Sequence, residues 1–127
     1  MQKIIFKPQT EWLPPEEFPD LSNHSEISID LETKDPELTK MGSGAIIGKG
    51  EVVGIAIAVE GWCGYYPIAH GGGGNMDKSM VLKWFQDVLN TKASKIFHNA
   101  MYDVCWIRAM GLKINGTIID TMIASAL

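Results

Sequence analysis

The sequence predicts an α/β domain in which helices flank a mixed β-sheet. Three observations lead to this prediction: a run that alternates apolar and polar side chains, two further apolar runs joined by only two residues, and helical patterns interleaved with short strands later in the chain. The chain has 127 residues, which allows one small domain, and 46% of its positions are hydrophobic, which is enough to bury a core.

Strand patterns dominate the first half of the chain. Apolar and polar side chains alternate over residues 26–31, as in a strand with one buried face, and the run stops at the turn residues 33–36. Residues 42–50 are rich in glycine and are expected to form a loop. Because Glu60-Gly61 alone separates the apolar runs 51–59 and 62–68, we expect these runs to form an antiparallel hairpin.

The second half alternates helices with short strands. The predicted elements lie at residues 77–89, 95–97, 99–110, 116–119 and from residue 121 onward. Asn75 or Asp77 is expected to cap the first of these helices, and Gly111 to close the second. Asp120 precedes the last helix and is placed to cap it.

The first 25 residues are predicted to form an N-terminal arm, and residues 26–127 the main domain. Four prolines between residues 8 and 19 exclude a regular helix or a central strand there. We therefore expect an extended segment laid over the surface, with Trp12, Leu13 and Phe18 as its candidate anchors.

Composition excludes several classes of protein. The net charge is −4, and residues 1–40 carry 4 basic and 9 acidic side chains, so a basic nucleic-acid footprint is absent. The apolar run at residues 52–59 is far shorter than the roughly 20 residues of a membrane-spanning helix, and residues 1–8 are too short and too charged for a signal peptide. Neither the three histidines nor Cys63 and Cys105 have the spacing of metal ligands. Reduced thiols and a cytoplasmic location are expected.

Two carboxylates lie at the end of the first predicted strand. Asp30 and Glu32 are two positions apart, so their side chains point to the same face and that of Leu31 to the other. Adjacent carboxylates repel each other, and a divalent cation between them removes this repulsion. Hard oxygen ligands suit Mg²⁺ or Mn²⁺. The simpler alternative is a solvated acidic pair.

A second acidic element opens the helix predicted at residues 99–110. Asn99 is placed to cap this helix, and Asp103, four positions later, lies on the same face. The helix dipole favours an acid in the first turn, so Asp103 also has an ordinary structural explanation.

Together the two elements resemble the first two motifs of the DEDD superfamily of 3′-5′ exonucleases, which have a ribonuclease H-like fold. The resemblance spans residues 11–127 in the same order and is strongest to the proofreading domain of family A DNA polymerases, especially phage-type ones. The similar stretches are ISIDLET at 27–33, YYPIAH at 65–70, KIFHNAMYD at 95–103 and DTM at 120–122.

The resemblance implies a two-metal hydrolysis that releases nucleoside monophosphates from the 3′ end of single-stranded DNA. The implied catalytic residues, which are also the implied ligands of two Mg²⁺ or Mn²⁺ ions, are Asp30, Glu32 and Asp103. The implied substrate-binding residues are Leu31, Thr33, Asn99 and Tyr102. Leu31 would lie under the terminal base, and Asn99 near the phosphate or an active-site carboxylate.

The sequence departs from the family at the third motif, a Tyr or His and a fourth carboxylate on a later helix. No such pair occurs before Leu127: Tyr65, Tyr66 and Tyr102 come too early, and Asp120 fits a helix cap better than a ligand. We therefore expect a C-terminally incomplete exonuclease domain, inactive alone, with a polymerase domain in the full-length chain, in the cytoplasm of a bacterium or a phage-infected host. A ribonuclease D-like exoribonuclease and a non-catalytic ribonuclease H-like fragment stay open as alternatives.

Overall fold

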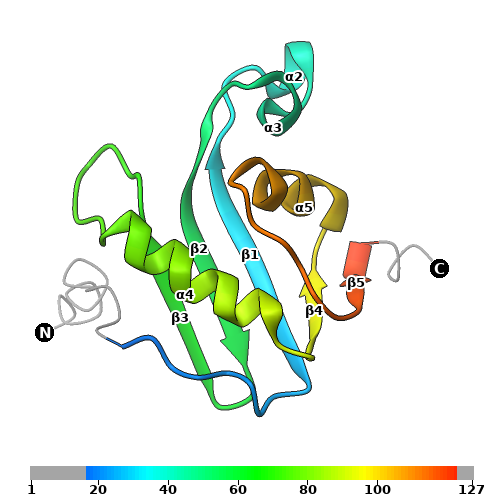
Figure 1. Cartoon of the computed structure of the whole chain (residues 1–127). Helices are drawn as coiled ribbons and strands as arrows, with labels where there is room; N and C mark the ends of the chain where they lie inside the picture. The colour runs from blue at the N-terminus through cyan, green and yellow to red at the C-terminus, as the bar shows by residue number, and fades with distance from the viewer. Residues whose placement is uncertain (1–16, 123–127) are drawn as a thin grey trace, which may run out of the picture.

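The computed structural model describes residues 17–122 and confirms a mixed sheet flanked by helices (Figure 1). The strands are β1 (Glu26–Lys34), β2 (Glu51–Val59), β3 (Trp62–Pro67), β4 (Ser94–Phe97) and β5 (Ile118–Asp120). Their order in the sheet is β3-β2-β1-β4-β5. The central strand β1 pairs antiparallel with β2 and parallel with β4, and β5 continues the sheet parallel to β4. Two candidate anchors of the N-terminal arm, Trp12 and Leu13, lie outside the described residues.

The two faces of β1 differ as the alternation predicts. Ile27, Ile29 and Leu31 are buried, whereas Asp30 and Glu32 are exposed. The helix α4 (Lys78–Asn90) covers the apolar face, as Figure 1 shows. The core residues of α4 are Val81, Trp84, Phe85, Val88 and Leu89. The carboxylates of β1 therefore lie on the face that α4 does not cover.

Residues 17–25 run along the edge of the core against an aromatic cluster. The ring centroid of Phe18 lies 5.6 Å from that of Tyr66 and 5.7 Å from that of Trp84. The indole of Trp84 donates a hydrogen bond to the carbonyl of Pro19 at 2.8 Å, and the hydroxyl of Tyr66 donates one to the carbonyl of Glu17 at 2.9 Å. The expectation that Phe18 anchors this segment is confirmed.

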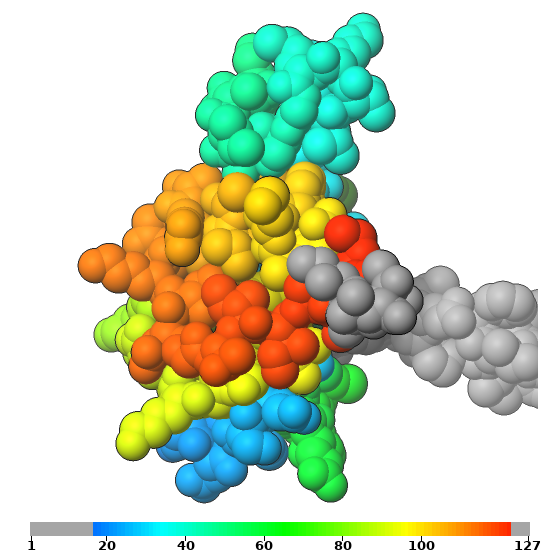
Figure 2. All heavy atoms as spheres, turned by 90° about the vertical axis from the view of Figure 1, so that its right-hand side faces the viewer, coloured from blue at the N-terminus to red at the C-terminus, as the bar shows by residue number. Residues whose placement is uncertain are grey.

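One short helix, α3 (Gly44–Ile47), replaces part of the loop expected at residues 42–50, and another, α2 (Leu38–Met41), precedes it. Figure 2 shows the two as a knob that projects from one end of the molecule. Ser43 caps α3 by accepting a hydrogen bond from the amide of Ala45. A single helical turn has no apolar periodicity, so the sequence pattern could not reveal these helices.

The cap of α5 (Ala100–Ala109) differs from the predicted one. Asn99 occupies the N-cap position with a φ of +70° but makes no side-chain capping bond. The carboxylate of Asp120 instead accepts hydrogen bonds from the amides of Asn99 and Ala100, both at 3.0 Å. Asp120 also accepts one from the amide of Met122, as predicted for the cap of the last helix. No helix between residues 17 and 122 has the length and apolar character needed to cross a membrane.

Candidate active site

Asp30 and Glu32 lie side by side on the open face of β1, as predicted. In the register of the sheet, Asp30 pairs with Ala56 of β2 and Glu32 with Gly54. Leu31 points the other way and is 8% exposed within the hydrophobic core. The expectation that Leu31 lies under a terminal base is therefore wrong, because α4 and the core occupy its side of the sheet.

Asp103 enters the same region from the first turn of α5. Its side chain is 4% exposed, and its Oδ2 atom has no hydrogen-bond partner. Burial and the negative charge of Asp30 raise the pKa of Asp103 to about 7, and a backbone hydrogen bond from Leu31 opposes this rise. The structure thus brings two of the predicted carboxylates, Asp30 and Asp103, into electrostatic contact.

Glu32 is held by a tyrosine from two strands away. The hydroxyl of Tyr65, on β3, donates a hydrogen bond to Glu32 Oε2 at 2.7 Å, and lies 2.5 Å from His70 Nε2. Burial and the adjacent Glu32 carboxylate raise the pKa of Tyr65 well above its ordinary value, so the phenol keeps its proton at neutral pH. Neither Tyr65 nor His70 was among the site residues predicted from the sequence.

Thr33 and Tyr102, predicted to bind substrate, meet where β1 approaches α5. Their hydroxyl oxygens are 2.8 Å apart, and Tyr102 donates to Asp35 Oδ2 at 2.8 Å. The phenol of Tyr102 has one proton, so Thr33 is the donor in their shared bond. Asp35 also accepts from the amide of Gly44 at 2.9 Å, which ties α3 to α5. Asn99, the remaining predicted substrate ligand, is exposed where α5 begins.

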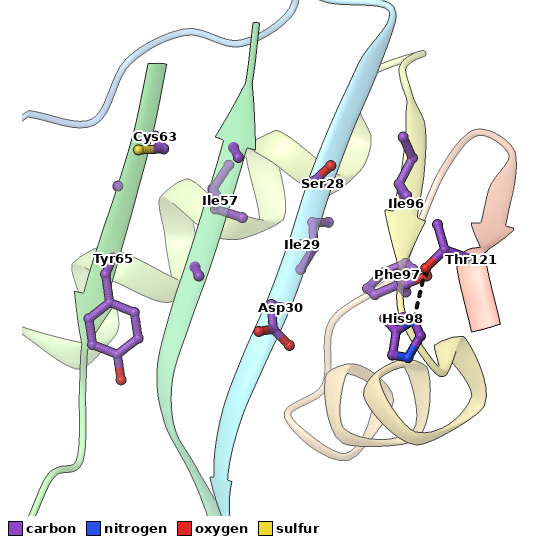
Figure 3. A pocket seen from close by; sticks show the side chains of 13 residues that line it. Ser28, Ile29, Asp30, Ile57, Cys63, Tyr65, Ile96, Phe97, His98 and Thr121 are labelled. Carbon is purple, nitrogen blue, oxygen red and sulfur yellow. Dashed lines mark hydrogen bonds between the residues drawn. The ribbon is translucent and has the colours of Figure 1, made fainter. Parts of the chain in front are cut away.

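A hollow of about 700 Å³ lies on the sheet face that carries Asp30. Residues of β1, β2, β3 and β4 line it, and Figure 3 shows Asp30, Tyr65 and His98 on this side of the sheet. His98 Nδ1 is hydrogen-bonded to the hydroxyl of Thr121 at 3.0 Å. Of the three predicted carboxylates, Asp30 therefore lines a space that can admit a ligand.

Asp30 and Asp103 are hard oxygen donors of the kind that a divalent cation takes, while Glu32 is engaged by Tyr65. Asp30 and Asp103 supply hard oxygen atoms, one of them unpartnered, and a cation would remove the repulsion between them. Between residues 17 and 122, no three His, Cys, Asp or Glu side chains are arranged to hold one metal ion. The third predicted ligand, Glu32, has one oxygen bound by Tyr65 instead.

An exposed carboxylate on the central strand of a mixed sheet, with a buried and unpartnered one near it, is compatible with a metal-dependent phosphodiester hydrolase. A family model described as 3′-5′ exonuclease matches residues 7–127, and the chain belongs to this family of 3′-5′ exonuclease domains. The resemblance drawn from the sequence motifs is thereby confirmed. Exonucleases of this type use divalent metal ions.

A relative described as a DNA-directed DNA polymerase, from Pseudomonas phage M6, is 37% identical over 111 residues. The match covers 82% of this chain but 16% of the relative, so the chain spans roughly one sixth of that protein's length.

Proposed function

We propose that this chain is the exonuclease part of a longer DNA polymerase and removes nucleotides from the 3′ end of single-stranded DNA. The observation that carries this proposal is the buried, unpartnered carboxylate of Asp103 beside Asp30, in a chain of the 3′-5′ exonuclease family. The polymerase context, the DNA substrate and action in the cytoplasm of a bacterium or phage-infected host are supported by the phage relative. Residues 26–127 would carry the exonuclease fold, with residues 1–25 as an arm.

In this proposal Asp30, Glu32 and Asp103 hold Mg²⁺ or Mn²⁺, two ions in the complete site. When bound, these ions supply Lewis-acid activation of the scissile phosphodiester and of the attacking water. Asp30 is exposed at the centre of the open face, where it can approach a ligand in the hollow. Asp103 is buried against β1 and fixes the other side of the cation site.

Three further residues are proposed to position the DNA strand. Asn99 is exposed at the N-terminus of α5, next to His98 at the rim of the hollow. Thr33 and Tyr102 form a hydrogen-bonded pair near the same end of α5 and are both partly exposed. Because this pair is tied to α3 through Asp35, it presents the DNA with a fixed rather than a mobile surface.

The proposal is tested by a nuclease assay of the full-length protein on a 5′-labelled single strand. Replacing both carboxylates of β1, Asp30→Ala with Glu32→Ala, is expected to reduce the ladder of shortened products to background, because no cation can then be held at the open face. The matched control is Glu60→Ala with Asp87→Ala, which removes two exposed acids from the hairpin turn and from α4.

An unchanged ladder in the Asp30 and Glu32 double variant would overturn the proposal. Matched DNA and RNA strands in the same assay separate it from a ribonuclease D-like activity, for which RNA would be degraded faster. A protein that binds neither Mg²⁺ nor Mn²⁺ in calorimetry would instead be a non-catalytic member of the fold.

A further inference from the structure

A chain of hydrogen bonds crosses three strands of the sheet from His70 through Tyr65 to Glu32. The bond from Tyr65 to Glu32 is 2.7 Å long, and the rings of Tyr65 and His70 meet edge to face with centroids 5.8 Å apart. A phenol has one proton, and an ionised carboxylate only accepts. Tyr65 therefore gives its proton to the bond with Glu32, and His70 Nε2 donates to Tyr65.

Gly54 opens the path that Tyr65 takes across β2. It lies between Glu32 on β1 and Pro67 on β3 in the register of the sheet. A Cβ atom at Gly54 would lie 1.8 Å from the hydroxyl oxygen of Tyr65 and 2.3 Å from its Cζ atom. Any other residue at this position would therefore push the tyrosine away from Glu32.

A bulge in β2 fixes the segment that carries His70. The pairing of β1 with β2 leaves Val53 as an extra residue, and its carbonyl accepts hydrogen bonds from the amides of Ile68 at 2.8 Å and Ala69 at 3.1 Å. The side chain of Asn75 then bonds both the amide and the carbonyl of His70, at 2.7 and 2.9 Å. Bulges beside active sites commonly redirect a side chain, and this one directs the backbone that holds His70.

We propose that Tyr65, held in place by His70, is a positioning residue for Glu32 in the exonuclease reaction; this inference rests on the proposed function. Tyr65 holds Oε2 of Glu32, and in this inference Oε1 is the atom that would bind the cation shared with Asp30. A free glutamate side chain loses rotamer freedom when it binds a cation, and a carboxylate that is already hydrogen-bonded loses less. The expected consequence is tighter cation binding and faster hydrolysis.

The decisive variant is Tyr65→Phe in the full-length protein. We expect kcat to fall about 10-fold and the Mn²⁺ concentration for half-maximal activity to rise by about 10-fold, the lower end of the effects seen for outer-shell partners of metal ligands. The KM for single-stranded DNA should stay unchanged. The matched control is Tyr66→Phe, which removes a hydroxyl that bonds the carbonyl of Glu17 and should leave kcat and the Mn²⁺ requirement unchanged.

Further variants at Gly54 and His70 test the hydrogen bonds from His70 through Tyr65 to Glu32 without altering Tyr65 or Glu32. Gly54→Ala should reproduce the Tyr65→Phe effect, because the added methyl group displaces the ring. His70→Leu should weaken Mn²⁺ binding in the same way, whereas His70→Gln should restore it, because the amide of glutamine can donate from nearly the same place as Nε2.

Mn²⁺ binding measured by calorimetry, without DNA, separates this inference from the proposed function. Weaker Mn²⁺ binding by Tyr65→Phe supports the positioning role even if the wild-type protein cleaves no DNA. Unchanged Mn²⁺ binding and unchanged kcat in Tyr65→Phe would show that Tyr65 only packs on the sheet. A higher kcat would show that it restrains Glu32 away from the cation. Either result overturns the inference.

Discussion

Asp103 lies in surroundings that oppose its negative charge. It is 4% exposed, its Oδ2 atom has no partner, and Asp30 adds a second negative charge nearby. The sequence assigns Asp103 to the site only through the resemblance of the two motifs together to the exonuclease family, because its spacing from Asn99 alone also fits an ordinary first-turn acid. Its burial could not be predicted, because it depends on how α5 packs against β1. Burial of the ionised Asp103 carboxylate next to Asp30 costs free energy, and a bound cation would lower this cost.

The raised pKa of Asp103 predicts how stability depends on pH. Its value of about 7 in the folded protein exceeds the usual 3.8, so the folded state binds more protons between these two pH values. Stability is therefore highest below pH 4 for this group and falls as the pH rises through 7. In metal-free protein, Asp103→Asn is expected to raise the free energy of unfolding at pH 8 by about 1–3 kcal/mol.

Urea unfolding in EDTA at pH 4, 6 and 8 measures this effect, with Asp87→Asn as the control because Asp87 is exposed on α4. The gain from Asp103→Asn should shrink toward zero at pH 4, where the wild-type carboxyl is also neutral. An equal gain at pH 4 and pH 8 would contradict the assignment of the cost to charge.

At the scale of elements, the correct predictions come from patterns that lie within one short stretch of sequence. The alternation in β1 and the apolar spacing in α4 follow from one face of each element packing on the core. The hairpin of β2 and β3 follows from the two residues that separate them. The cap of α5 was predicted wrongly because Asp120 reaches it from 21 positions along the chain. The contact of Tyr65 with Glu32 was missed for a similar reason. The hairpin register pairs Tyr65 with Ala56, and Ala56 with Asp30, but the reach over Gly54 is visible only in three dimensions.

The cap supplied by Asp120 predicts a loss of stability on its removal. Asp120→Ala leaves the amides of Asn99 and Ala100 without their acceptor, so the free energy of unfolding should fall by about 1–2 kcal/mol. Asn99→Gly keeps the left-handed backbone and removes a side chain that makes no capping bond, so it should change stability by less than about 0.5 kcal/mol.

Urea unfolding and amide exchange in α5 measure both variants. If Asn99→Gly destabilised α5 as much as Asp120→Ala, the side chain of Asn99 would be the cap after all. A loss of Mn²⁺ binding with unchanged stability in Asp120→Ala would instead identify Asp120 as a ligand.

At the scale of the whole molecule, the acidic excess of the first 40 residues has a specific location. It includes Asp30 and Glu32, whose charges gather on the open sheet face and would be balanced by bound cations. A net charge of −4 is therefore compatible with a nucleic-acid substrate. The carboxylates of Asp30 and Glu32 would repel phosphate when free, but bound cations would neutralise them.

This balance predicts that divalent cations stabilise the folded protein as a whole. A cation that binds the folded state at ten times its dissociation constant adds about 1.4 kcal/mol to the free energy of unfolding. Titration with Mg²⁺ or Mn²⁺ should therefore raise the melting temperature in a saturable way, and Asp30→Asn should remove the increase. Na⁺ at the same ionic strength controls for general screening, which has no saturation at a single site. A cation at the open face would relieve the repulsion between Asp30 and Asp103, so its binding should depend on Asp30. An equal increase in melting temperature for wild type and Asp30→Asn would therefore show that the cations bind elsewhere.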